Sequence, residues 1–124
     1  MQIRVYYEDT DAGGVVYHSN YLKFCERARS EIFFVKNADI FDSTKGHFLL
    51  TKANCHFLKS AKLGDILEVK TKLLEFKKAS LLISQQIYKK EEKLFEAEFT
   101  LAFVKDSKAT RIDESLRKLF EESF

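Results

Sequence analysis

The chain has 124 residues, 45% of them hydrophobic, including 12 Phe and 5 Tyr. This length and apolar content predict a single domain over residues 1–124 with a well-filled core. The 21 basic and 19 acidic residues leave a net charge of only +2. That balance argues against a general polyanion binder, and no basic-aromatic interleaving suggests a nucleic-acid surface.

Two features of the sequence indicate a cytoplasmic protein. Cys25 and Cys55 suit reduced thiols better than a disulfide framework. The N-terminus does not resemble a signal peptide, because charged residues begin at Arg4. We expect no transmembrane segment, since no apolar run approaches the roughly 18 to 20 residues that cross a bilayer.

The first predicted element is a short strand over residues 3–7, which runs into an acidic turn ending at Asp11. Gly13 and Gly14 follow that turn. Glycine permits a positive φ or the close approach of a ligand to the backbone. The turn is therefore a candidate site.

A helix is predicted over residues 18–36, where apolar residues recur at helical spacing. Ser19 or Asn20 is expected to cap its start at about His18. The first backbone N–H groups of the helix would then point, unpaired, into the space beside Asp11. A carboxylate facing donors at the positive end of a helix dipole suits acyl transfer, in which an oxyanion forms and collapses.

After a polar connection at residues 37–47, the pattern changes to strands and then to a short amphipathic C-terminal helix. The four predicted strands cover residues 48–59, 66–76, 81–89 and 94–104, and the helix covers residues 113–124. An order of strand, helix and four consecutive strands predicts an α+β antiparallel architecture.

Residues 4–29 also resemble a family signature. The matching residues are Arg4-Val5, Thr10-Asp11, Gly14-Val15-Val16-Tyr17, His18, Asn20-Tyr21 and Glu26-Arg27-Ala28-Arg29. They are similar to the hotdog-fold acyl-CoA thioesterases of the 4-hydroxybenzoyl-CoA thioesterase family, and within it to the YbgC-type branch. The resemblance implies a sheet of about five strands wrapped around the helix, and a homodimer with a continuous sheet and interface active sites. It also implies that dimers pair into a homotetramer.

The resemblance makes Asp11 the essential carboxylate. By composition alone, Glu8, Asp9 and Asp11 read as a solvated acidic loop. In the resembled family this aspartate either attacks the thioester carbonyl or activates a water, and the sequence leaves both routes open. The amide that binds the thioester oxygen in the family corresponds here to that of His18 or a neighbour.

Three aromatic side chains flank Asp11, and each has two interpretations. His18 either contacts the substrate, including by proton transfer near neutral pH, or is an exposed polar residue. Tyr7 either orients Asp11 through its hydroxyl or packs in the core. Tyr17 lines the acyl pocket or packs the helix rather than taking part in the chemistry.

Coenzyme A phosphates require a basic site. Lys77, Lys78 and Ser80 lie at a predicted turn and match the region of the family's nucleotide-binding basic residues. A solvated lysine pair on a hairpin is the alternative. Lys59, Ser60 and Lys62 at the preceding turn form a second, weaker candidate. Exposed contacts of this kind position the ligand and weaken with salt.

The predicted activity is hydrolysis of acyl-CoA, with acyl carrier protein as the alternative carrier. We expect no metal, because the three histidines lack paired ligand spacing, and no other cofactor, because CoA is part of the substrate. Two alternatives remain: a hotdog hydratase or dehydratase acting on acyl thioesters, and a non-catalytic acyl-carrier-binding module.

Overall fold

The computed structural model describes residues 1–35 and 46–124, so most of the predicted connection at residues 37–47 lies outside the described residues. The elements are β1 (Gln2–Arg4), the 3-10 helix η1 (Tyr7–Asp9), α1 (His18–Val35), β2 (His47–Phe57), β3 (Ile66–Phe76), β4 (Ser80–Lys89), β5 (Glu92–Lys105), β6 (Lys108–Ala109) and α2 (Glu114–Ser123). Among the described residues, no helix combines the length and the apolarity required to cross a bilayer.

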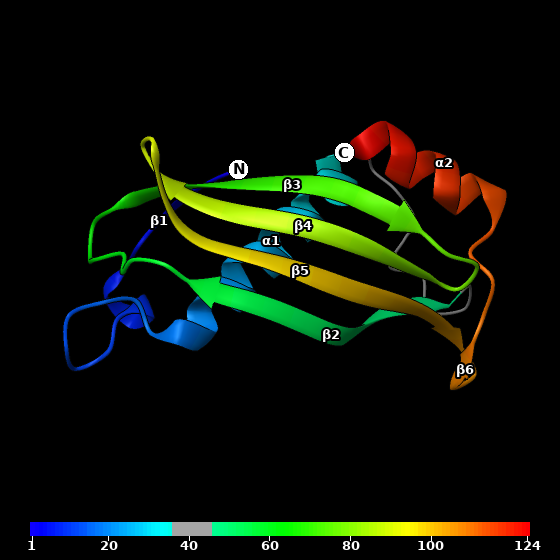
Figure 1. Cartoon of the computed structure of the whole chain (residues 1–124), viewed down its shortest axis with the longest axis horizontal. Coiled ribbons are helices and arrows are strands. Elements are labelled where there is room, and N and C mark those ends of the chain that lie inside the picture. The colour runs from blue at the N-terminus through cyan, green and yellow to red at the C-terminus, as the bar shows by residue number, and fades with distance from the viewer. Residues whose placement is uncertain (36–45) are drawn as a thin grey trace.

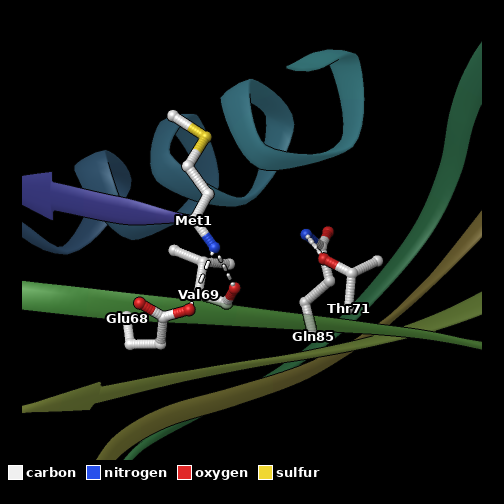
Figure 2. Close-up of polar contacts among 5 residues, drawn as sticks. All are labelled: Met1, Glu68, Val69, Thr71 and Gln85. Carbon is white, nitrogen blue, oxygen red and sulfur yellow. Dashed lines mark hydrogen bonds and ion pairs between the residues drawn. The ribbon is translucent and has the colours of Figure 1, made fainter. Parts of the chain in front are cut away.

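The strands form one antiparallel sheet in the order β1-β3-β4-β5-β2, with β6 attached to the end of β5. The sheet is a single curved layer with α1 behind it, and α2 lies at one end (Figure 1). Met1, which precedes the edge strand β1, is also bonded to β3. Its ammonium group donates hydrogen bonds to the Glu68 carboxylate and to the Val69 carbonyl (Figure 2). The predicted α+β hotdog architecture is confirmed.

Alternation along β4 shows how the sheet meets the helix. Leu81, Ile83, Gln85 and Ile87 are buried, whereas Leu82, Ser84 and Gln86 between them are half-buried on the opposite face. From α1, Phe24 and Cys25 contribute fully buried side chains to the same layer. This period-two burial against a single helix is the hotdog arrangement, because one face of the sheet must cover the helix.

The other end of the core is closed by α2. Asp113 caps this helix by accepting a hydrogen bond from the Leu116 amide at 2.8 Å. Phe120 is fully buried, and its ring lies 4.8 Å from that of Phe33 and 5.2 Å from that of Phe48. The predicted C-terminal helix is therefore confirmed.

Two local predictions at the N-terminus are wrong. The first strand ends at Arg4 rather than at Tyr7, because the Asp9 carboxylate accepts the Tyr6 amide at 2.9 Å and the chain turns into η1. The main helix begins at His18 as expected, but Ser19 and Asn20 both lie inside it, so neither acts as the cap. Instead, the Asn20 side chain donates to the Asp9 carbonyl at 2.9 Å.

Candidate functional site

The loop that carries Asp11 is closed by its own backbone. The Asp11 amide donates to the Val15 carbonyl at 2.9 Å, and the Gly14 amide donates to the Asp11 carbonyl at 3.0 Å. Gly14 has a φ of +80°, so this position favours glycine. The predicted need for a positive φ is thus met at Gly14.

The Asp11 carboxylate is exposed and turned back toward its own loop. Its Oδ1 atom accepts the Gly13 amide at 2.8 Å and the Val15 amide at 3.4 Å. A Cβ atom at Gly13 would lie 3.2 Å from this oxygen. The local Asx turn therefore holds the carboxylate, and among the described residues no other group bonds it.

The loop is fastened to the first turn of α1 through one backbone carbonyl. The Asp9 carbonyl accepts the Tyr17 amide at 3.0 Å as well as the Asn20 side chain. By helix geometry the first amides of α1 have no intrahelical acceptor. Within residues 1–35 and 46–124, no group accepts the His18 amide. The acidic loop and an open helix start are thus joined.

The side chains of His18 and Tyr17 cover this helix start. Both are exposed, and their ring centroids lie 4.3 Å apart. The His18 ring also meets the edge of Phe57 at 6.3 Å, which places the end of β2 beside the helix start. An imidazole in this position can donate a hydrogen bond to a ligand or exchange a proton with it.

Tyr7 does not pack in the core, because its side chain is 82% exposed. Its carbonyl accepts the Thr10 amide and hydroxyl. Among the described residues, none bonds the Tyr7 hydroxyl, so no direct contact with Asp11 is present.

Tyr21 has a structural role on the buried face of α1. Its ring stacks on that of Phe95 at 5.2 Å, and its hydroxyl accepts the buried Ala61 amide at 3.0 Å. Burial raises the pKa of this hydroxyl. Tyr21 therefore joins α1 to the segment after β2, which in turn bonds the loop through the Val16 amide and the Ala61 carbonyl at 2.9 Å.

The thiols of Cys25 and Cys55 are both poorly suited to act as nucleophiles, because burial raises the pKa of each. Cys25 is fully buried, and burial raises the pKa of its thiol to about 12. A thiol in that state is inert near neutral pH, because the thiolate is the reactive form. Asp11 and His18 are exposed, one in the loop and the other at the open helix start.

Strand register separates the two predicted basic sites. Lys59 follows the Phe57 end of β2, near the start of α1, and forms an exposed ion pair with Glu92 at 2.7 Å. Ser60, next in the chain, is exposed. By contrast, Ser80 pairs with Ala102 at the other end of the sheet. At about 3.4 Å per residue, the ends of β2 lie roughly 34 Å apart.

The turn between β3 and β4 bears Lys77 and Lys78, both with exposed side chains. Its backbone is tied to the C-terminal segment, because Arg117 donates to the carbonyls of both lysines and the Ile112 amide donates to the Lys78 carbonyl at 2.8 Å. Lys77, Ser80 and Lys52 line a pocket of about 220 Å³, whereas Lys78 lies outside its lining. The structure therefore brings together only two of the three residues predicted here.

Comparisons with known proteins agree with this architecture. The model of the thioesterase-like superfamily matches residues 5–120. The chain is 41% identical to the acyl-CoA thioesterase YbgC of Helicobacter pylori, over 98% of this chain and 96% of that protein. It is 39% identical to the acyl-CoA thioester hydrolase YbgC of Escherichia coli O157:H7, over 82% of this chain and 78% of that protein.

A solved structure of a hypothetical protein from Aquifex aeolicus aligns with a TM-score of 0.90 at 27% identity, covering 96% of both chains. A probable thioesterase from Bartonella henselae aligns with a TM-score of 0.83 at 31% identity, covering 92% of this chain and 96% of that one. Sequence, strand order and these relatives agree, and the chain belongs to the thioesterase-like superfamily of hotdog-fold proteins.

Proposed function

We propose that this protein is an acyl-CoA thioesterase of the YbgC type, which converts acyl-S-CoA and water into a free acid and CoA. The observation that carries the proposal is the Asp11 loop, which the Asp9 carbonyl ties to a helix start with an open His18 amide. The acyl-CoA thioesterases among the relatives support the same substrate class.

In the proposed reaction, the thioester carbonyl lies between Asp11 and the amide of His18. As a general base, Asp11 takes a proton from the water that bonds to the carbonyl carbon; as a nucleophile, it bonds to that carbon and water then hydrolyses the anhydride. In both routes the C–S bond breaks and the thiolate leaves. One backbone donor to the oxyanion contributes about 3 to 4 kcal/mol to transition-state stabilisation.

The unpaired edge of β2 supports a homodimer. Among the described strands, β2 ends the sheet order and pairs only with β5. Leu49, Leu50, Phe57 and Leu58 leave about half of their side chains exposed along it. A long, apolar edge strand favours pairing with another strand. Antiparallel pairing of two β2 strands would continue the sheet across the dimer, and two such dimers would form the expected tetramer.

A β2–β2 dimer would also account for the separation between the predicted basic residues at the β3–β4 turn and His18. In one chain, the turn with Lys77 and Ser80 lies at the opposite end of the sheet from His18. Across an antiparallel β2–β2 contact, the turn of one subunit lies beside the helix start of the other. The proposed site thus takes Asp11, His18, Tyr7 and Tyr17 from one chain and Lys77, Lys78 and Ser80 from its partner, with Lys59 and Ser60 flanking the first group.

A thiol-release assay over short, long and aromatic acyl-CoAs, and over acyl carrier protein thioesters, tests the proposal. We expect CoA release with at least one acyl group. A hydratase would leave the thioester intact and release no thiol. A binding module would show no turnover, and its ligand affinity would be unchanged in Asp11→Asn. Light scattering measures the oligomeric state, and a monomer at assay concentration would contradict the shared site.

A further inference from the structure

A second pocket lies on the helix side of the sheet, between α1, β2 and α2, with a volume of about 350 Å³. Its walls are largely apolar and include Phe33, Phe48, Leu101 and Phe120. Small-molecule sites of about this size typically combine apolar walls with a few polar groups that fix the orientation of the ligand. Here the polar lining residues are Glu26, Arg29, Ser30 and His47.

Arg29 is a partly buried cation, and the charge of Glu26 on the same helix acts on it electrostatically. Nη1 donates to Gln85 Oε1 at 2.8 Å, and the guanidinium lies 4.8 Å from the centre of the Phe99 ring. Across the residues that the structure describes, no acidic side chain forms an ion pair with it. Arg29 has five N–H groups, and among the described residues one of them makes a hydrogen bond, to the neutral amide of Gln85. Burial lowers the pKa of the guanidinium, as expected for a charge removed from water.

Gln85 holds Arg29 in place. Gln85 is fully buried, and its Nε2 atom donates to the Cys25 carbonyl at 3.0 Å and to Thr71 Oγ1 at 2.9 Å. Figure 2 shows Gln85 and Thr71 facing each other from neighbouring strands. With both amide hydrogens used, Oε1 is oriented to accept from Arg29. The cation is therefore fixed at the pocket rather than free to turn into solvent.

A buried guanidinium is favourable when a planar anion completes its hydrogen bonds, because the fork of N–H groups matches a carboxylate. Glu26 also lines the pocket, but its carboxylate accepts the Ser30 hydroxyl at 2.6 Å and so points to its own helix. The chemistry of the pocket therefore suits a ligand with an apolar body and one carboxylate.

We propose that this pocket receives the far end of the acyl group and that Arg29 binds a carboxylate there, so that ω-carboxyacyl-CoA thioesters are preferred substrates. The inference rests on the proposed thioesterase function and on the β2–β2 contact. Arg29 lies 11 residues after His18 on α1, which is about 16 Å along the helix. In contrast, Phe48 at the pocket lies at the end of β2 that would adjoin the helix start of a second copy.

The experiment compares pairs of acyl-CoAs of equal carbon number: succinyl with butyryl, adipoyl with hexanoyl, and suberoyl with octanoyl. For one chain length we expect the wild-type kcat/KM to be at least about tenfold higher for the carboxylated member, as for a charged hydrogen bond at a desolvated site. Hydrolysis without such a preference at any length would overturn the Arg29 assignment alone. No thiol release from any acyl-CoA would overturn the thioesterase function as well.

Variants separate recognition from folding. Arg29→Met should lose the preference for the carboxylated substrate while hydrolysis of the unsubstituted acyl-CoA persists. Arg27→Met, an exposed change on the same helix, should keep the preference. Glu26→Gln should keep or increase it, because a negative charge near the ligand is removed. Equal losses on both substrates in Arg29→Met would show that Arg29 acts only in packing.

Subunit mixing tests the placement of the pocket. Asp11→Asn and Arg29→Met chains are co-expressed and assayed on the preferred carboxylated substrate. If Asp11 and the pocket come from different chains, each mixed dimer has one intact site, and random assembly restores about a quarter of wild-type activity. If both come from one chain, mixing restores nothing and the shared pocket is refuted.

Discussion

The two ends of the sheet are built by different means. At the Asp11 end, backbone hydrogen bonds and glycine shape the loop, and the reactive side chains lie exposed on it. At the Lys77 end, the turn is held by another part of the chain, because the Arg117 side chain and the Ile112 amide donate hydrogen bonds to its backbone carbonyls. A side-chain substitution at the Asp11 end should therefore alter the chemistry and leave the fold unchanged. At the Lys77 end, a substitution should affect both the function and the fold.

The same difference divides the functional groups by role. The first end offers a carboxylate and an open amide at a helix start, which suits bond making and breaking. The second end offers exposed lysines, whose attraction to phosphate is long in range and screened by salt. The groups proposed for chemistry and those proposed for ligand capture thus lie at opposite ends of the sheet of each chain, and the proposed dimer would bring them together.

The largest effect is expected for Asp11→Asn, which keeps the size of the side chain and an oxygen that can accept the Gly13 amide. Loss of the base or nucleophile should lower kcat/KM at least about 10³-fold, or about 4 kcal/mol, with an unchanged free energy of unfolding. Glu8→Gln, an exposed change in the same turn, is the control and should retain activity. Near-normal thiol release by Asp11→Asn would remove Asp11 from the mechanism.

Tyr21→Phe tests the anchor of the Asp11 end. It leaves the buried Ala61 amide without its acceptor, which should lower the free energy of unfolding by about 2 kcal/mol. Tyr17→Phe is the matched control, because its exposed hydroxyl has no partner among the described residues. Urea denaturation measures both variants, and equal stabilities would mean that the Tyr21 bond makes no net contribution.

Much of the fold was predictable because its signals are local. Apolar periodicity identified α1, alternation identified β3, and Asp113 opens α2. The errors arose where a single side chain redirects the backbone. The Asp9 carboxylate ends the first strand early, and the Asp9 carbonyl takes the Asn20 side chain that was expected to act as a cap.

The site was predictable only in part. The sequence indicated the Asp11 loop and the start of α1, since both lie in one continuous segment. It did not indicate that Lys59 and Lys77 lie at opposite ends of the sheet, because that depends on strand register. The roles of Arg117 and Gln85 were also missed, because each acts through bonds to distant parts of the chain.

Arg117→Met tests the support of the Lys77 end. It removes the bonds to the two lysine carbonyls and should cost about 1 kcal/mol of stability, because water can reach these exposed carbonyls. KM for acyl-CoA should rise by roughly threefold to fivefold, or about 1 kcal/mol of binding free energy, because the turn that carries the lysines is less firmly held. KM for the matching acyl-pantetheine, which lacks the nucleotide, should stay unchanged. Lys118→Met on the same helix is the control. A parallel rise with both substrates would show that the turn does not bind the nucleotide.

The smallest effect is expected for Lys77→Ala, because an exposed charge contributes little in water. KM for acyl-CoA should rise about twofold at low ionic strength and return to the wild-type value near 1 M salt, where the screening length falls to about 3 Å. Lys23→Ala, an exposed change on α1, should leave KM unaffected at either salt concentration. An effect of Lys77→Ala that does not depend on salt would indicate a packing role for Lys77. In that case, the salt response of Lys77→Ala and Asp11→Asn would no longer distinguish a residue that attracts the ligand from one that takes part in the chemistry.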